Sequence, residues 1–218
     1  MMAAAPVDAA APAAAATTNA ASPLYLEAPG AHPRPWEVHK FGGASLATAD
    51  LYKQCSDLLV AESRRTLESG SAPACTPTMA IVSARGGVTD RLVEVVEASR
   101  TSIDEAERLL KLVAAEQLEV VAELSDAAHV ATVGAAFERD VSDIIGLLRA
   151  FSTLKAVPDS AAGAISGYGE IWSAMTMHAY LDASGIPAAW IDAREVLIVE
   201  ESGGAGLGEK GSTNVMGT

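Results

Sequence analysis

The stretch WEVHKFGGAS, residues 36–45, decides the fold class of this chain. Its first six residues alternate between apolar and polar side chains well enough to predict a β-strand, and the pair Gly42-Gly43 then ends that strand. A helical pattern follows over residues 46–68. The order of strand, glycine loop and helix is the repeating unit of α/β proteins, so this stretch predicts the first such unit.

A second unit of the same kind follows along the chain. Residues 79–83 form a short apolar run suited to a buried strand, residues 85–87 break it, and a helix is predicted at about residues 89–99. Further strands are predicted at residues 187–191 and 195–199. Strands that alternate with helices predict an α/β sandwich with a largely parallel central sheet, in which ligands bind at the carboxyl ends of the strands.

After the second unit the sequence predicts a helical hairpin. Ser102 and Glu105 form a capping-box pattern at the start of a helix that continues to Leu124, and residues 141–154 carry the apolar stripe of a second helix. Packing in a core explains both stripes better than coiled-coil pairing, which needs a longer heptad run.

The segment beyond the hairpin carries weaker signals. Residues 158–167 predict a loop or a short strand. A helix is predicted at residues 170–183, and Ser184-Gly185 ends it.

The composition sets the class of protein and excludes several partners. The chain has 218 residues, enough for one domain with a core, and its formal net charge is −13. This acidic balance argues against nucleic acids and anionic membrane surfaces, and no apolar run approaches the roughly 20 residues of a membrane span. Cys55 and Cys75 are predicted to be free thiols in a reducing compartment, and no metal-ligand spacing joins them to the histidines.

Both ends of the chain differ in composition from the rest. Residues 1–35 are rich in alanine and proline, and we expect them to be disordered. They are either a transit peptide, for which a single basic residue, Arg34, beside Asp8 and Glu27 is unusual, or a leader without function. Residues 200–218 are rich in glycine and lack periodicity, so a disordered tail is predicted.

The first glycine loop, KFGGAS at residues 40–45, has the properties of a phosphate site. Gly42 and Gly43 allow the backbone to approach an anion closely, and the helix start that follows offers free N–H groups. Lys40 beside the loop can neutralise charge on a transferring phosphoryl group. The other interpretation is a tight strand-to-helix turn with a solvated lysine, and the spacing by itself favours that interpretation.

Two further loops carry polar side chains at helix starts. In VSARGGVTD, residues 82–90, the hydroxyl groups of Ser83 and Thr89 are candidates for holding a small polar substrate, although Thr89 can also be an N-cap. In SGYGEIWSA, residues 166–174, Glu170 falls in the first turn of a helix. There it either binds a substrate ammonium group or acts as a capping-type acid.

Taken together, these loops resemble the motifs of the aspartate kinases, which belong to the amino acid kinase family. A fourth segment, WIDAREVLI at residues 190–198, looks like the strand that follows the motifs in that family. The sequences of the third and fourth segments most resemble those of the plant-type bifunctional aspartokinase/homoserine dehydrogenases. The resemblance covers about residues 36–199, and four ordered motifs are not expected to agree by chance. It implies a three-layer α/β sandwich, the N-terminal portion of the amino acid kinase fold, with an inserted helical hairpin.

The resemblance also implies a reaction and a set of site residues. The reaction is phosphoryl transfer from Mg·ATP to the side-chain carboxylate of L-aspartate, which gives 4-phospho-L-aspartate for lysine, threonine, methionine and isoleucine synthesis. The residues implied to bind ATP are Lys40, Phe41, Gly42, Gly43 and Ser45, with Lys40 also stabilising the transition state. The residues implied to hold L-aspartate are Ser83, Thr89 and Glu170. Full-length members are expected to be homo-oligomers. The resemblance to the plant-type enzymes implies localisation in a chloroplast, with the cytoplasm as the alternative.

Several positions depart from the family pattern. Ala44 replaces a commoner threonine, and Arg85 stands where methionine or serine is commoner. After Val199 the resemblance stops, because the glycine-rich segments expected downstream are not found. We therefore expect residues 36–199 to form the N-terminal portion of a kinase domain and the isolated chain to be inactive because it is incomplete. The alternatives are a kinase for glutamate, acetylglutamate, carbamate or uridylate, and a truncated product that is inactive or binds a full-length partner.

Overall fold

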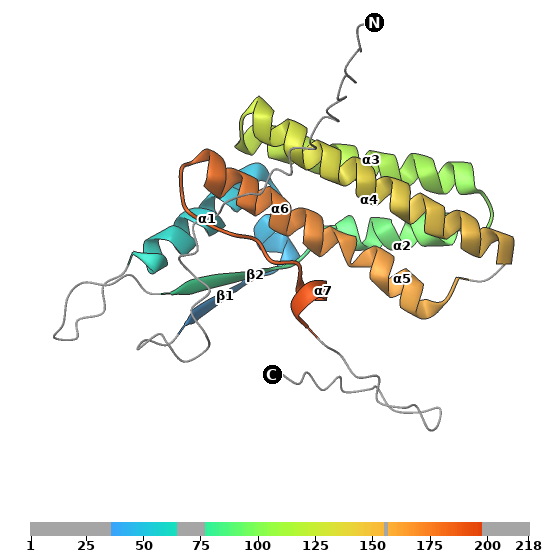
Figure 1. The fold of residues 1–218 in the computed structure, drawn as a ribbon, viewed down its shortest axis with the longest axis horizontal. Helices are drawn as coiled ribbons and strands as arrows, with labels where there is room; N and C mark the ends of the chain where they lie inside the picture. Colours follow the sequence, from blue (N-terminus) through green and yellow to red (C-terminus); the bar gives the residue numbers. More distant parts are fainter. Residues whose placement is uncertain (1–35, 65–76, 155–156, 198–218) are drawn as a thin grey trace, which may run out of the picture. The chain divides into compact units, whose positions relative to one another are not determined.

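The computed structural model describes three ranges of the chain, residues 36–64, 77–154 and 157–197. Within them, strand β1, Glu37–Phe41, pairs in parallel with strand β2, Thr78–Val82. Helices α1 and α6 contact β2, and Figure 1 shows both on one side of the two strands. The predicted leader and tail, and Cys75, lie outside the described residues, so those expectations stay predictions.

The two strands follow the alternation of the sequence. In β1 the side chains of Val38 and Lys40 are exposed. Phe41 packs against a hydrophobic cluster that includes Leu46, Tyr52 and Leu181. Lys40 stands opposite Ile81 in the parallel register. Because parallel strands end at the same edge of a sheet, the glycine loops that follow them begin side by side, as predicted.

A short turn separates β1 from its helix. Gly43–Leu46 form a 3-10 helix, η1, and helix α1 then runs over Ala49–Ser63. Thr48 caps α1, because its hydroxyl accepts a hydrogen bond from an amide of the first turn at 3.4 Å. The helix predicted over residues 46–68 is therefore present but begins later, and its last residues lie outside the described ranges.

The predicted helical hairpin consists of α3, Ile103–Leu124, and α4, Ala127–Leu154. Ser102 caps α3 by accepting a hydrogen bond from the Glu105 amide at 3.2 Å, as the capping-box pattern predicts. The carboxylate of Glu105 does not complete the box, because it forms a two-bond ion pair with Arg108. Helix α4 begins well before the apolar stripe predicted for it.

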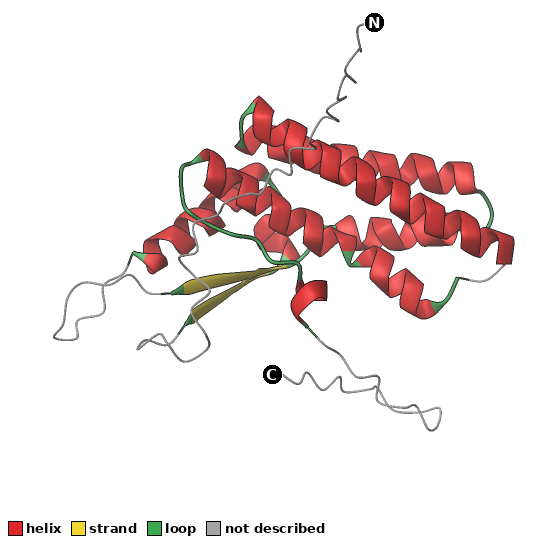
Figure 2. Ribbon diagram, in the orientation of Figure 1, coloured by secondary structure: helices red, strands yellow, loops and turns green. Residues whose placement is uncertain are grey.

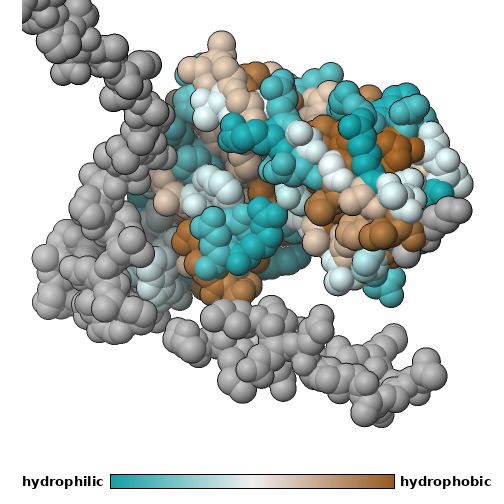
Figure 3. All heavy atoms as spheres, turned by 45° about the vertical axis from the view of Figure 1, so that its right-hand side comes forward, coloured by the Kyte–Doolittle hydropathy of each residue, from teal (hydrophilic) through white to brown (hydrophobic). Residues whose placement is uncertain are grey.

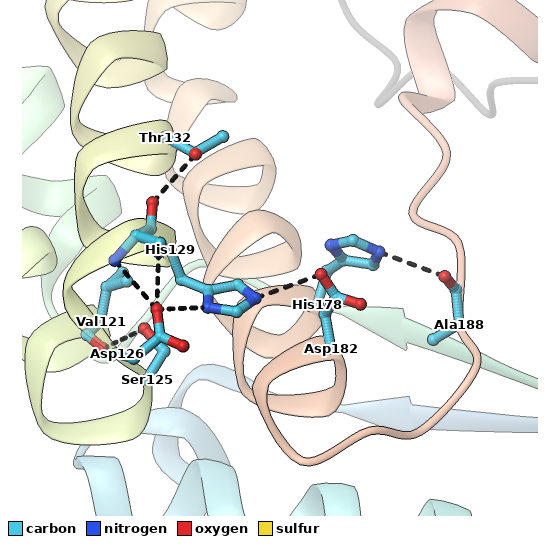
Figure 4. Close-up of polar contacts among 9 residues, drawn as sticks. Val121, Ser125, Asp126, His129, Thr132, His178, Asp182 and Ala188 are labelled. Atoms are coloured by element: carbon cyan, nitrogen blue, oxygen red, sulfur yellow. Dashed lines mark hydrogen bonds and ion pairs between the residues drawn. The ribbon is translucent and has the colours of Figure 1, made fainter. Parts of the chain in front are cut away.

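The start of α4 is tied to the end of α6, Tyr168–Ala183 (Figure 4). Oδ1 of Asp126 accepts a hydrogen bond from the His129 amide at 3.0 Å and lies 2.8 Å from Nδ1 of the imidazole. Nε2 of the same ring lies 3.1 Å from Oδ2 of Asp182. The hydrogen bond to Asp126, and next the one to Asp182, raise the pKa of His129, against the lowering effect of burial.

The larger of the two hydrophobic clusters lies between the hairpin, α6 and helix α2, Val88–Ser99. Trp172 is its largest fully buried side chain, and the indole N–H donates to Oδ2 of Asp140 at 2.9 Å. The indole ring also lies 5.1 Å from the ring of Phe137. Other fully buried members are Leu92, Leu110, Ile144 and Leu148. The two apolar stripes therefore pack in the core, which confirms that interpretation of the hairpin.

The prediction of a loop or short strand at residues 158–167 is wrong, because helix α5 occupies Asp159–Ser166. Pro158 has extended backbone just before the helix, where its missing N–H is not needed, and the alanines that follow favour a helix. Helix α6 ends at Ala183 as predicted, with Ser184 as its C-cap, and Gly185 follows with a φ of 68° in the left-handed region.

The strand predicted at residues 187–191 is also wrong, because these residues form no regular element. The strand predicted at residues 195–199 is wrong where it is described, since helix α7 covers Ala193–Val196. The carboxylate of Asp192 accepts a hydrogen bond from the Arg194 amide at 2.9 Å and so starts a helical turn.

These elements make the fold class α/β, as predicted, and the described ranges contain two strands among many helices (Figure 2). On the face drawn in Figure 3, hydrophobic residues form separate groups between hydrophilic ones. Within the described ranges, no helix is both long and apolar enough to cross a membrane.

Candidate functional site

The three glycine loops meet at Ala84. A Cβ atom placed on Gly43 would lie 2.9 Å from the carbonyl oxygen of Ala84, and one placed on Gly169 would lie 2.8 Å from its Cβ atom. A Cβ atom on Gly86 would lie 3.2 Å from the carbonyl oxygen of Gly43. The backbones approach so closely that a side chain at Gly43 or Gly169 requires a shift of the structure. The fold thus brings together three segments that the sequence singled out separately.

The first loop places a lysine over a glycine. The ammonium nitrogen of Lys40 would lie 3.6 Å from a Cβ atom on Gly42, so the side chain runs along the loop. The amide of Ser45 donates to the carbonyl oxygen of Gly42 at 2.9 Å, which closes the turn. Cys55 has a free thiol, which donates to the carbonyl oxygen of Ser45 at 3.2 Å, and burial raises the pKa of this thiol.

The second loop continues the sheet and then starts α2. The amide of Ser83 donates to the carbonyl oxygen of Phe41 at 3.0 Å, beyond the last residue of β2. Gly87 is the N-cap of α2 with a φ of 83°, which favours glycine. Thr89 is exposed in the first turn, so its alternative role as an N-cap is wrong and its hydroxyl is not engaged in capping. Asp90 is the first-turn acid.

The third predicted loop is helical, because Ser166 ends α5 and α6 begins at Tyr168, with Gly167 as the turn between them. We keep the name third loop for this junction, which starts α6 against the start of α2. A Cβ atom on Gly169 would lie 3.1 Å from Cγ1 of Val88, so the two helix starts are in contact. Their sequence neighbours Thr89 and Glu170 therefore begin two helices at one place in the fold. Glu170 is half-buried in the first turn, and the N-cap of α6 is Gly167, without a side-chain cap.

The arrangement suits a ligand that carries negative charge. Two helices begin at the meeting point, and helix starts carry free N–H groups and partial positive charge. Lys40 adds a full positive charge at the first loop, whereas Glu170 supplies one carboxylate for a cationic group. Phosphate and an amino acid are the kinds of ligand that these groups can bind together.

Arg194 is a site candidate that the sequence reasoning left without a role. Its guanidinium carbon lies 5.0 Å from the ring centroid of Tyr168, two residues before Glu170. The carboxylate of Asp192 holds the guanidinium, with 2.6 Å between NH2 and Oδ2, and these hydrogen bonds raise the pKa of Arg194 and lower that of Asp192. The available signal was the Asp-x-Arg-Glu pattern, in which the aspartate can orient the arginine.

A buried polar network behind the loops also escaped prediction. Oη of Tyr52 lies 2.7 Å from Oγ of Ser173, and the side-chain amide of Gln117 donates to Oγ1 of Thr176 at 2.8 Å. All four side chains are buried, and burial raises the pKa of Tyr52. Gln117 stands in an apolar stripe, so periodicity alone places it in the core without indicating partners.

A groove of about 680 Å³ lies elsewhere, between α3 and α4. Its lining includes Ala114, Phe137 and Ile145, with Glu107 and Arg149 also among the lining residues, and no predicted site residue takes part. Among the described residues, no group of three or more His, Cys, Asp or Glu side chains is placed to hold a metal ion.

Comparison with solved structures establishes the fold. Over 77% of this chain and 33% of the other, the chain superposes with a TM-score of 0.61 on Escherichia coli aspartokinase III in complex with aspartate and ADP, at 21% identity. The same enzyme in complex with lysine and aspartate gives a TM-score of 0.60 at 22% identity. The chain therefore has the amino acid kinase fold.

Sequence comparisons identify the family. The bifunctional aspartokinase/homoserine dehydrogenase 2 of Escherichia coli is 30% identical over 166 residues, which are 76% of this chain and 18% of that protein. The chloroplastic enzyme of the same name from Zea mays is 29% identical over 168 residues, 77% of this chain and 17% of that protein. The chain thus spans less than a fifth of the length of these relatives. Residues 35–215 match the sequence model of the Amino acid kinase family, and the chain therefore belongs to this family.

Proposed function

We propose that this chain provides the phosphate-binding and aspartate-binding loops of an aspartate kinase, which forms 4-phospho-L-aspartate from L-aspartate and ATP. The observation that carries the proposal is the meeting of the three loops at Ala84. This contact puts a lysine-bearing glycine loop next to two helix starts with a hydroxyl and a carboxylate, as a reaction between a nucleotide phosphate and an amino acid requires.

On the phosphate side, the first loop carries the role. A side-chain carboxylate oxygen of aspartate attacks the γ-phosphorus of ATP, the bond to the β–γ bridging oxygen breaks, and ADP leaves with the electron pair. Lys40 neutralises charge on the transferring group, and the backbone from Phe41 through Gly43 to Ser45 surrounds the phosphates. Mg²⁺ comes with the nucleotide, and we assign it no protein ligand.

On the aspartate side, the groups come from the second and third loops. Glu170 receives the ammonium group, and the hydroxyl groups of Ser83 and Thr89 bind carboxylate oxygens. We propose that Arg194, which lies over the ring of Tyr168, binds a carboxylate of the substrate. These residues position the reacting oxygen, since no protein nucleophile is needed.

The second candidate is a chain that binds these ligands without turnover. This chain superposes on 33% of the length of aspartokinase III, so ligand binding and turnover are measured separately. A kinase of the same family for another acidic substrate, such as glutamate or acetylglutamate, differs from both in the substrate it binds.

The test measures ATP binding and aspartyl phosphate formation by the purified chain. Calorimetry gives the dissociation constant for Mg·ATP, and hydroxylamine traps the acyl phosphate. Lys40→Ala is expected to weaken ATP binding at least about tenfold and to abolish any turnover, because it removes the charge beside the phosphates. Lys53→Ala is the matched control, since Lys53 lies on α1 in a surface pair with Asp50 at 3.7 Å.

The outcomes separate the candidates. Turnover with L-aspartate but not with glutamate or acetylglutamate confirms the aspartate kinase, and binding without turnover favours the second candidate. A wild-type chain that binds no ATP, or a Lys40→Ala variant that binds it as well as Lys53→Ala does, removes the basis of the proposal.

A further inference from the structure

Arg85 of the second loop has a side chain that is directed into the protein. Only 16% of it is exposed, and its Nε donates to Oε1 of Gln117 in α3 at 2.9 Å. Its NH2 lies 3.7 Å from Oε2 of Glu116, which also pairs with Arg91 of α2. Two consecutive residues of the helical hairpin therefore hold the guanidinium.

Gln117 connects this contact to the buried network. Its Oε1 accepts from Arg85, while its Nε2 donates to Thr176 and lies 3.5 Å from Oη of Tyr52. A buried amide keeps one orientation only when both its oxygen and its nitrogen have partners. Arg85 thus fixes Gln117, and Gln117 in return fixes Arg85 relative to α1, α3 and α6.

The backbone of Arg85 lies at the meeting point of the loops. Its neighbours Ala84 and Gly86 both contact Gly43, and its carbonyl oxygen accepts a hydrogen bond from the Val88 amide at 2.9 Å. A side chain anchored on α3 therefore sets where the start of α2 stands relative to the first loop.

We infer that Arg85 is a positioning residue, which acts through Glu116 and Gln117 to hold the second glycine loop, and with it Ser83 and Thr89, in the geometry that binds the ligand. The identity of that ligand rests on the proposed function, whereas the hold on the loop does not. The helical hairpin, which supplies none of the predicted ligand-binding residues, becomes the support of the site.

The test uses the full chain and hydrogen–deuterium exchange read at single amides by NMR. Arg85→Met keeps much of the length of the side chain and removes its hydrogen bonds. We expect the loop amides of Ser83 and Val88 to exchange at least about tenfold faster, with the amides of α4 unchanged, because the loop opens locally. Arg108→Met is the matched control, since that arginine is 60% exposed and pairs within its own helix.

A conservative variant guards against misfolding. Arg85→Lys keeps the charge and loses the planar fork, so its exchange rates should fall between those of wild type and Arg85→Met. Where Arg85→Met does not fold, Arg85→Lys against Arg108→Lys makes the same comparison. Unchanged rates at the loop, or faster exchange spread evenly through α4, overturn the inference.

A ligand titration separates this inference from the proposed function. The dissociation constant for L-aspartate, measured by calorimetry, is expected to rise about tenfold in Arg85→Met and to stay constant in Arg108→Met. If the wild-type chain binds no L-aspartate, the proposed function fails while the exchange rates still decide the role of Arg85. If Arg85→Met binds L-aspartate as tightly as wild type, the positioning role fails and the proposed function stands.

Discussion

At the scale of single residues, lack of space explains the glycines at positions 43 and 169 of the meeting point. Gly43 and Gly169 face atoms closer than 3.0 Å to the position of a Cβ atom, and neither has a positive φ. Gly87 is different, because its φ of 83° requires glycine although no atom lies within 4 Å of its Cβ position. The sequence shows a glycine in both cases, but only the fold distinguishes close approach from backbone conformation.

A substitution at Gly169 measures the close approach. Gly169→Ala is expected to lower the free energy of unfolding by about 1–3 kcal/mol, because overpacking against Ala84 and Val88 outweighs the preference of helices for alanine. Gly163→Ala in α5 is the control and should raise it by about 0.5–1 kcal/mol, since open space surrounds its Cβ position. Urea titration followed by circular dichroism gives both values. A Gly169→Ala chain as stable as wild type would show that the loops can move apart.

The candidate site was predictable only in part from its residues. Lys40 and Glu170 stand where strand ends and helix starts are expected, because local patterns decide those positions. The hold of Gln117 on Arg85 was not predictable, since it joins residues that are distant in sequence and leaves no periodic trace. Thr89 was a candidate cap because a hydroxyl commonly caps a helix, but Gly87 is the N-cap of α2.

At the scale of elements, prediction succeeded where a local signal was strong. Glycine pairs after apolar runs located β1 and β2, and apolar periodicity located α3 and α4. It failed beyond α6, where an apolar run resembles a strand but no described strand pairs with it. Whether such a run becomes a strand depends on a distant partner, which local sequence does not contain.

The junction of α4 and α6 predicts a dependence of stability on pH. The folded-state pKa of His129 is raised, so its contribution is complete below the unfolded value of about 6.5 and is lost as pH rises through the folded value. Asp126 has a lowered pKa, first because the His129 amide donates to it, and its contribution is lost only in acid. The stability difference between wild type and His129→Gln should therefore be larger near pH 5.5 than near pH 8.5.

Urea titrations at the two pH values check this prediction. His178→Gln is the control, because Nε2 of His178 lies 3.2 Å from the carbonyl oxygen of Ala188, a neutral partner (Figure 4). A His129→Gln difference that is the same at both pH values would mean that the charged imidazole does not contribute.

At the scale of the whole molecule, the core centred on Trp172 holds α2, α4 and α6 together. Trp172→Phe is expected to lower the free energy of unfolding by about 2–4 kcal/mol, because it leaves a cavity and removes the donor from the half-buried carboxylate of Asp140. Trp190→Phe is the control, since Trp190 is 39% exposed, and should change it by less than about 0.5 kcal/mol. Urea titrations followed by circular dichroism give both free energies of unfolding. Equal changes in Trp172→Phe and Trp190→Phe would contradict the central place of Trp172 in the core.

The contact between the loops also has a consequence for how the chain acquires its site. The contacts of Ala84 with Gly43 and Gly169 join segments that leave the ribosome at widely separated times. Single helices, turns and the α3–α4 hairpin can form early, because their contacts are local, whereas the contact with Gly169 has to wait until α6 has docked. A nascent chain that ends before α6 thus contains the first and second loops and still lacks the contact with Gly169 that completes the proposed ligand site.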